Sequence, residues 1–208
     1  MKTVPGRTGC QPVALENRLA TCSTDTGSPS SAAFKRTRQA PPDVRLAAFQ
    51  TDLGWMGAAI SPRGWAMLTL PWPTRQAALD ELRVRYPTAV LAEEGILGDL
   101  PERLRRYLAG ERVDFPQALD LTAGTPFQQQ VWQTLLRIPT GETRSYGWVA
   151  AAIGRPRAAR AVGQAVGANP INIIIPCHRV VGSDGSLTGY GGGLPLKQRL
   201  LDLERKKP

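Results

Sequence analysis

Short apolar runs alternate with turn residues between Val44 and Leu70, which is the pattern of a small β-sheet. The runs VRLAAFQT, GWMGAAIS and GWAMLTL are each long enough for one strand, and residues 61–64 (Ser-Pro-Arg-Gly) separate the last two. Because Pro and Gly favour tight turns, these two runs are predicted to form a hairpin. Apolar residues at helical spacing then predict helices near residues 74–86 and 99–109, the second ending at Gly110.

The C-terminal part of the chain has the periodicity of helices. Thr125 and Gln128 flank Pro126 in the spacing of a capping box, so a helix is predicted to begin there. Two shorter helices follow near residues 146–153 and 157–167, separated by a Gly-Arg-Pro break at residues 154–156. This arrangement predicts a helix-turn-helix whose second helix carries Arg157 and Arg160. The alternative is that the many small residues of the second helix serve only to pack against its neighbour.

Composition divides the chain into three segments. Residues 1–43 are rich in Pro, Ser, Thr and Gly and show no periodicity, which predicts a flexible N-terminal tail. Residues 44–119 are expected to form an N-terminal α/β domain, and residues 120–208 a mainly helical C-terminal domain. No apolar run approaches the roughly 18–20 residues of a membrane-spanning helix, and no secretion signal is evident, so the expected location is the cytoplasm.

Positive charge is concentrated in the last segment. The chain has a net charge of +9, of which +3 falls in residues 1–43, zero in residues 44–119 and +6 in residues 120–208. Surface Lys and Arg can serve solubility alone. The asymmetry between two folded segments instead favours a nucleic-acid surface on the C-terminal one.

Three cysteines and a single histidine exclude several classes of protein. Cys10, Cys22 and Cys177 form no CxxC pair, and His178 is the only imidazole, so a zinc finger or other metal site is not expected. Three widely spaced cysteines also argue against a disulfide scaffold. A papain-like protease needs a histidine distant in sequence from its cysteine, and this chain has none.

The candidate chemistry lies at residues 171–182, INIIIPCHRVVG. A cysteine after isoleucines is usually an inert core residue, and the histidine beside it can be merely structural. Pro176, however, places Cys177 and His178 at a bend, the charge of Arg179 is expected to favour a thiolate, and His178 can act as the base. Because adjacent side chains on an extended chain point apart, a water relay between the two is expected.

The motif IPCHRVV, preceded by ARAVGQAVGANP and followed by GSLTGYGGGLPLKQRLLDLE, resembles the O6-alkylguanine-DNA alkyltransferases, the methylated-DNA–protein-cysteine methyltransferase family. The resemblance covers Thr125 to Glu204. It implies an α/β fold, with a small RNase H-like N-terminal domain followed by a winged helix-turn-helix-like C-terminal domain. It further implies a single-turnover enzyme without cofactor that binds double-stranded DNA containing O6-alkylguanine, acts as a monomer, and needs no protein partner or membrane.

The resemblance also assigns roles to individual residues. Cys177 is expected to accept the alkyl group, His178 to deprotonate it through water, Glu204 to orient His178, and Asn169 to hold the bend before the cysteine. Arg160 is expected to enter the base stack from the minor groove after the nucleotide flips out. The other expected contacts to the base, its pocket or the DNA are Tyr146, Arg157, Arg179, Val180, Val181, Tyr190, Gly191 and Lys197.

Two positions depart from the family pattern. Gly191 stands where some relatives have serine, and Asn172 where some have proline, so the range of alkyl groups and the acceptance of O4-alkylthymine stay open. The competing hypothesis is a non-catalytic helix-turn-helix module that binds lesions or regulates DNA with an inert cysteine.

Overall fold

The structure is a computed structural model that describes residues 43–205. The predicted tail of residues 1–43, with Cys10 and Cys22, lies outside the described residues except for Asp43, and so do residues 206–208. Within residues 43–205, no helix has the length and apolar character needed to cross a membrane.

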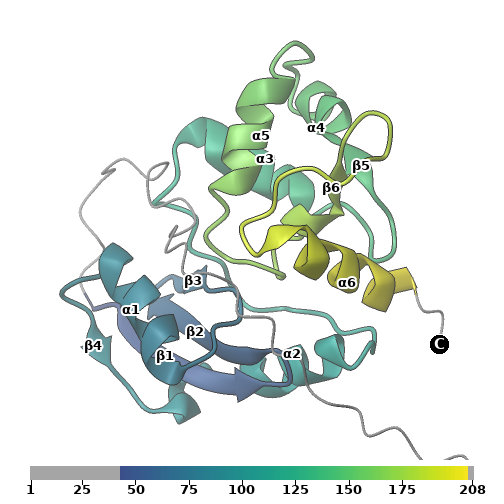
Figure 1. The fold of residues 1–208 in the computed structure, drawn as a ribbon. Coiled ribbons are helices and arrows are strands. Elements are labelled where there is room, and N and C mark those ends of the chain that lie inside the picture. Colours follow the sequence, from purple (N-terminus) through teal and green to yellow (C-terminus); the bar gives the residue numbers. More distant parts are fainter. Residues whose placement is uncertain (1–42, 206–208) are drawn as a thin grey trace, which may run out of the picture.

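The first half of the described chain is built on a four-stranded sheet in the order β3-β2-β1-β4 (Figure 1). Strands β1 (Arg45–Thr51), β2 (Gly54–Ser61) and β3 (Gly64–Leu68) form an antiparallel meander, and β4 (Val90–Leu91) joins the edge of β1 in parallel. The predicted hairpin is confirmed as β2 and β3. It turns at residues 62–63, as the Pro-Arg-Gly sequence indicated.

Alternate residues of β1 face two different cores, because successive side chains of a strand point to opposite faces. Val44 and the even-numbered apolar residues of β1 pack against α1 (Arg75–Arg85). Phe49 and Ala47 point to the other face, where they join the large core that includes α2 (Leu100–Leu108). Both helices were predicted. The short 3-10 helix η2 (Glu94–Leu97) connects β4 to α2, and Gly110, with φ +92°, follows the end of α2 as expected.

The free edge of β3 pairs with two later segments of the chain, one around residues 118–120 and one at Pro170. The backbone N–H of Trp65 donates to the Ala118 carbonyl at 2.9 Å, and that of Asp120 donates to the Trp65 carbonyl at 2.7 Å. Further along the same edge, the Leu68 N–H donates to the Pro170 carbonyl at 2.9 Å. The segment that leads to Cys177 is therefore fixed on the sheet.

The second half is mainly helical. It contains α3 (Pro126–Leu135), α4 (Tyr146–Ala152), α5 (Ala159–Gly167) and α6 (Gly193–Arg205), with a 3-10 turn η3 (Cys177–Arg179) and a two-stranded parallel pair, β5 (Arg144–Ser145) and β6 (Val180–Val181). The predicted capping box is present at the start of α3, with the Thr125 hydroxyl accepting from the Gln128 N–H and the Gln128 side chain accepting from the Thr125 N–H. Figure 1 shows α3, α4 and α5 grouped together above the sheet half.

The two short helices are confirmed, with one correction. Helix α5 begins at Ala159, so Arg157 lies in the turn before it rather than on the helix. Pro156 precedes Arg157, and the Ala158 N–H closes a turn on the Arg155 carbonyl at 2.9 Å. Because this turn ends at Ala158, the helix starts at Ala159 and not at Arg157. Arg160 lies in the first turn of α5, as predicted.

Candidate active site

The bend at Cys177 is held by one amide side chain. Asn169 follows the end of α5, and its Nδ2 donates to the Ile175 carbonyl at 2.8 Å and to Cys177 Sγ at 3.1 Å. Its Oδ1 accepts from the Ile171 N–H at 3.0 Å. The Asn169 side chain is therefore hydrogen-bonded both to the start of the loop, at Ile171, and to its end, at Ile175 and Cys177. Cys177 begins the 3-10 turn η3 after Pro176, so the extended geometry assumed for the Cys-His pair is wrong, because the chain has already turned there.

Cys177 is a neutral thiol in this environment. It is a free cysteine with 5% of its surface exposed. Burial raises the pKa of the Cys177 thiol above its ordinary value, and the Asn169 hydrogen bond and the Lys197 charge oppose this rise without overcoming it. The expectation that Arg179 supplies the activating charge is wrong, since Lys197 is the cation that acts on the sulfur.

Arg179 instead pairs with Glu204, near the end of α6. Its Nε donates to Glu204 Oε2 at 2.9 Å and its Nη2 to Oε1 at 2.8 Å, which is a bidentate ion pair. Its Nη1 also donates to the Ile138 carbonyl at 2.6 Å, and the side chain is only 11% exposed. The guanidinium sits inside the protein and is oriented toward Glu204, so its predicted DNA contact finds no support in its placement.

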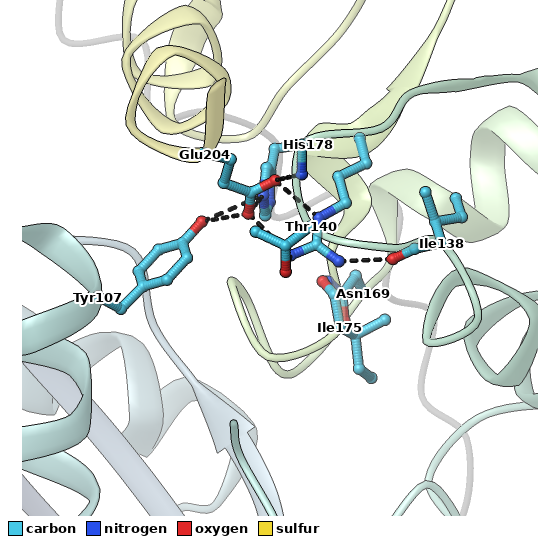
Figure 2. A network of polar contacts seen from close by, with 9 residues as sticks. Tyr107, Ile138, Thr140, Asn169, Ile175, His178 and Glu204 are labelled. Carbon is cyan, nitrogen blue, oxygen red and sulfur yellow. Dashed lines mark hydrogen bonds and ion pairs between the residues drawn. The ribbon is translucent and has the colours of Figure 1, made fainter. Parts of the chain in front are cut away.

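The carboxylate of Glu204 accepts five hydrogen bonds (Figure 2). Besides the two from Arg179, Oε1 accepts from His178 Nε2 at 2.9 Å and from the Tyr107 hydroxyl at 2.7 Å, and Oε2 accepts from the Gly141 N–H at 3.2 Å. Burial raises the pKa of Glu204, but the hydrogen bonds from His178 and Arg179 and the charge of Arg179 outweigh burial and hold it well below its usual range. Glu204 is therefore ionised at neutral pH.

An ionised Glu204 decides which nitrogen of His178 carries the proton. Because the carboxylate can only accept, Nε2 must be the protonated nitrogen, and Nδ1 keeps its lone pair. Nδ1 is buried and has no hydrogen-bond partner among the described residues. Burial lowers the pKa of His178, which Glu204 only partly offsets, so the ring is neutral. A neutral imidazole with a free Nδ1, on the residue that follows Cys177, has the protonation state of a general base.

Tyr107 was missed by sequence reasoning, which found no catalytic group in residues 44–119. Its position in the apolar stripe of α2 marked it as a core residue, and it is indeed only 5% exposed. The apolar stripe says nothing of where the hydroxyl points. The available signal was that a buried tyrosine hydroxyl needs a hydrogen-bond partner, and no local residue provides one.

Val180, Val181, Tyr190 and Lys197, called here the thiol wall, follow the reactive turn in sequence, and Lys197 and Tyr190 interact electrostatically with Cys177. Val180 and Val181 are buried in β6, and the buried Lys197 ammonium donates to the carbonyls of Val180 at 2.6 Å and Thr188 at 2.8 Å. The hydroxyl of Tyr190 is buried without a partner among the described residues. Lys197 thus ties the loop that carries Tyr190 to the strand after the reactive turn.

The two departures from the family pattern have different surroundings, since Asn172 lies near the thiol and Gly191 lies near Leu70. Asn172 donates through Nδ2 to the Leu68 carbonyl at 3.0 Å, and its Oδ1 lies 4.0 Å from Cys177 Sγ. A Cβ at Gly191 would lie 3.6 Å from the Leu70 side chain, which is an ordinary contact. A side chain at Gly191 would therefore fit without moving the backbone.

Comparisons with known proteins agree with this geometry. A family model described as "6-O-methylguanine DNA methyltransferase, DNA binding domain" matches residues 126–206. A methylated-DNA–protein-cysteine methyltransferase of Mycobacterium tuberculosis is 56% identical over 115 residues, which cover 55% of this chain and 69% of that protein. The chain belongs to this methyltransferase family.

Solved structures extend the likeness to both halves. A crystal structure of the M. tuberculosis O6-methylguanine methyltransferase is 42% identical, with a TM-score of 0.65, and the match covers 78% of this chain and 93% of that one. A crystal structure of M. tuberculosis OGT in complex with DNA is 42% identical, with a TM-score of 0.64, over 77% of this chain and 92% of that one. The predicted fold class, an α/β half followed by a mainly helical half, is confirmed.

In this methyltransferase, three of the residues predicted to contact DNA or the flipped base fall on α4, α5 and the turn between them. Arg157 and Arg160 are exposed and form no ion pair among the described residues. Tyr146 is half-buried at the start of α4, where its ring lies 3.8 Å from the position of a Cβ on Gly163, and its hydroxyl accepts from Thr188 at 3.3 Å. Tyr146 therefore contacts both the helix that carries Arg160 and the loop of the thiol wall. The roles of these residues toward DNA stay predictions.

Proposed function

We propose that this protein repairs DNA by transferring the alkyl group of O6-alkylguanine in double-stranded DNA irreversibly to Cys177. The observation that carries the proposal is the linked set Cys177, His178 and Glu204. The thiol is buried beside a neutral imidazole whose Nε2 is fixed by an ionised carboxylate and whose Nδ1 is free. The family membership of the chain, and the DNA complex of a 42% identical relative, support the same activity.

The reaction needs a proton to leave the thiol before the sulfur attacks. His178 Nδ1 takes that proton through a bridging water, and the positive charge that develops on the ring is stabilised by Glu204. The thiolate then attacks the alkyl carbon, the S–C bond forms, and the bond from carbon to O6 breaks with its electron pair going to the guanine. The hydroxyl of Tyr190, which has no protein partner, is available to donate a hydrogen bond to the departing purine.

A raised pKa at Cys177 suits a protein that reacts once. Because burial keeps the resting thiol neutral, its nucleophilicity appears only when His178 can accept the proton. Each molecule is consumed by one transfer, so a thiol that stayed ionised without substrate would be exposed to oxidation. Asn169 donates a hydrogen bond to the sulfur and so keeps Cys177 Sγ in place before and during the reaction.

The lesion must leave the duplex to reach the thiol, since Cys177 is buried and the alkylated oxygen lies within the base stack. Flipping a nucleotide costs a few kcal/mol. We assign Arg160, which is exposed at the start of α5 and has no ion-pair partner within residues 43–205, to fill the vacated space from the minor groove, with Arg157 and Tyr146 near the backbone. A cytoplasmic location and a monomeric state belong to the same proposal, because reducing conditions keep Cys177 free.

The test is to locate the transferred group. The protein is incubated with a duplex that contains one O6-methylguanine, and its peptides are mapped by mass spectrometry. We expect the methyl group on the peptide that carries Cys177, in the wild type and in a Cys10→Ala/Cys22→Ala variant alike. Cys177→Ala is expected to bind the duplex and accept nothing. DNA binding by the wild type without any methylated peptide would instead establish the non-catalytic binding module.

A further inference from the structure

One of the five hydrogen bonds to Glu204 comes from the other half of the chain. Tyr107 lies near the end of α2, and its ring packs edge-on against Phe115 at a centroid distance of 6.1 Å. Its hydroxyl donates to Glu204 Oε1 at 2.7 Å and lies 3.3 Å from His178 Nε2 (Figure 2). Burial, with the charge of Glu204, raises the pKa of the Tyr107 hydroxyl far above its ordinary value, so it stays a donor at any physiological pH.

Oxygen Oε1 of Glu204 is the point where three donors meet. Arg179 reaches it from η3 at 2.8 Å, His178 from the same turn at 2.9 Å, and Tyr107 from α2. The Gly141 N–H donates to the other oxygen, so every donor to the carboxylate except Tyr107 comes from the C-terminal half. Tyr107 adds a donor from a separate helix, which further limits rotation of the carboxylate, and the orientation of the carboxylate in turn sets the plane of the His178 ring.

A small cavity lies beside the contact between Tyr107 and Glu204, and a water molecule in it could take the place of the Tyr107 hydroxyl as a donor. The cavity has a volume of about 10 Å³, room for about one water molecule, and is lined by Tyr107, Gly110, Thr140, Leu203 and Glu204 among others. A water that entered here could donate to Glu204, but it would lack a fixed direction. The tyrosine ring supplies the same hydrogen bond from a rigid helix.

The geometry points to Tyr107 as a positioning residue of the transfer reaction, which holds the His178 ring in its orientation by fixing Glu204 from the N-terminal half. The inference rests on the proposed function, since it describes the same site. It means that the sheet half of the chain takes part in the chemistry, through α2, and does more than support the DNA-binding half.

The experiment compares Tyr107→Phe with the matched control Tyr86→Phe. Tyr86 is also buried in the sheet half, at 2% exposure, but its hydroxyl contacts the Ala66 carbonyl at 3.5 Å and the Arg85 side chain, and it has no contact with Glu204 or His178. Because each molecule reacts once, the amplitude of a single-turnover reaction with the O6-methylguanine duplex counts the folded protein, and the rate reports the chemistry. We expect full amplitude in both variants and a rate about tenfold lower in Tyr107→Phe alone, the typical effect of losing one hydrogen bond to a charged group.

A second experiment observes the His178 imidazole directly and does not require the protein to be active. His178 is the only histidine, so nitrogen-15 NMR of an untagged protein reports its tautomer and titration without overlap. We expect the imidazole nitrogen signals and the apparent pKa of His178 to shift in Tyr107→Phe and not in Tyr86→Phe. An unchanged rate or an unchanged His178 signal in Tyr107→Phe overturns the inference, and so does an equal effect of both variants. A wild type that transfers no methyl group would refute the proposed function instead, while the NMR arm would still test the positioning of His178.

Discussion

Replacing Glu204 with glutamine removes one negative charge from the centre of the site while keeping the size of the side chain. The side chain is 1% exposed, and its two oxygens accept five hydrogen bonds. Glutamine offers one acceptor oxygen, and its amide group brings two hydrogens toward donors that already point there. Arg179 is left without its counter-ion, and His178 loses the acceptor that fixes its tautomer.

The expected loss of stability follows from this buried pair. Removing one partner of a buried ion pair costs about 3–5 kcal/mol. Arg179 keeps its bond to the Ile138 carbonyl and is partly exposed, so we expect the lower end, about 3 kcal/mol. For a domain of this size, each kcal/mol lowers the melting temperature by about 2–4 °C, which predicts a drop of about 10 °C in Glu204→Gln. The transfer rate is expected to fall by about 10² to 10⁴, because the amide can favour the wrong tautomer of His178.

The stability lost in Glu204→Gln is expected to depend on pH in a characteristic way. The pKa of Glu204 in the folded state lies well below its ordinary value of 4.5. Its contribution is therefore fully present above pH 4.5 and is lost as the pH falls toward the folded-state pKa. The difference in unfolding free energy between wild type and Glu204→Gln is expected to be largest near neutral pH and to shrink in acid.

Thermal and urea unfolding at several pH values test this, together with single-turnover kinetics. Glu111→Gln is the matched control, since Glu111 pairs with Arg106 at 2.7 Å but both side chains are 50% exposed. An exposed pair is worth no more than about 1 kcal/mol. The reasoning is refuted if Glu204→Gln is as stable as Glu111→Gln, or if it transfers at the wild-type rate.

Three further predictions concern the base, the duplex and the pocket. Because the pKa of His178 lies below 6.5, the transfer rate should stay constant from neutral pH down and fall only in acid, and a midpoint above pH 7 would contradict this assignment. Arg160→Ala should slow repair of duplex far more than reaction with free O6-benzylguanine, and equal losses would remove its role in flipping. Lys197→Met leaves the carbonyls of Val180 and Thr188 without their donor, so we expect about 2–4 kcal/mol lower stability by urea unfolding and slower reaction with the free base; unchanged kinetics would exclude its role in shaping the pocket.

Local features of the fold were readable from the sequence because local rules determine them. The hairpin follows from the Pro-Arg-Gly turn, and the start of α3 follows from Thr125 and Gln128, which satisfy each other's backbone donors across three residues. The start of α5 was misplaced because helical periodicity continues backward through Arg157, whereas a turn closed on Arg155 holds that residue outside the helix.

The reactive turn was readable as a motif, but its electrostatics were not. Arg179 is adjacent in sequence to the Cys-His pair, and adjacency suggested that its charge acts on the sulfur. The fold instead directs it to Glu204, and the cation that acts on Cys177 is Lys197, twenty residues further along the chain. Tyr107 lies farther still from Glu204 in sequence. Such contacts depend on tertiary packing between α2, η3 and α6, which no local pattern encodes.

The central claim is that Cys177 accepts one alkyl group and that the protein is then spent. It is tested most directly by mixing the protein with a large molar excess of O6-methylguanine duplex and counting methyl groups lost from DNA and gained by protein, by intact mass, until the reaction stops. We expect one methyl group per molecule, all of it on protein, and no further repair. Continued loss of methyl groups from DNA beyond that stoichiometry, or none at all, would contradict it.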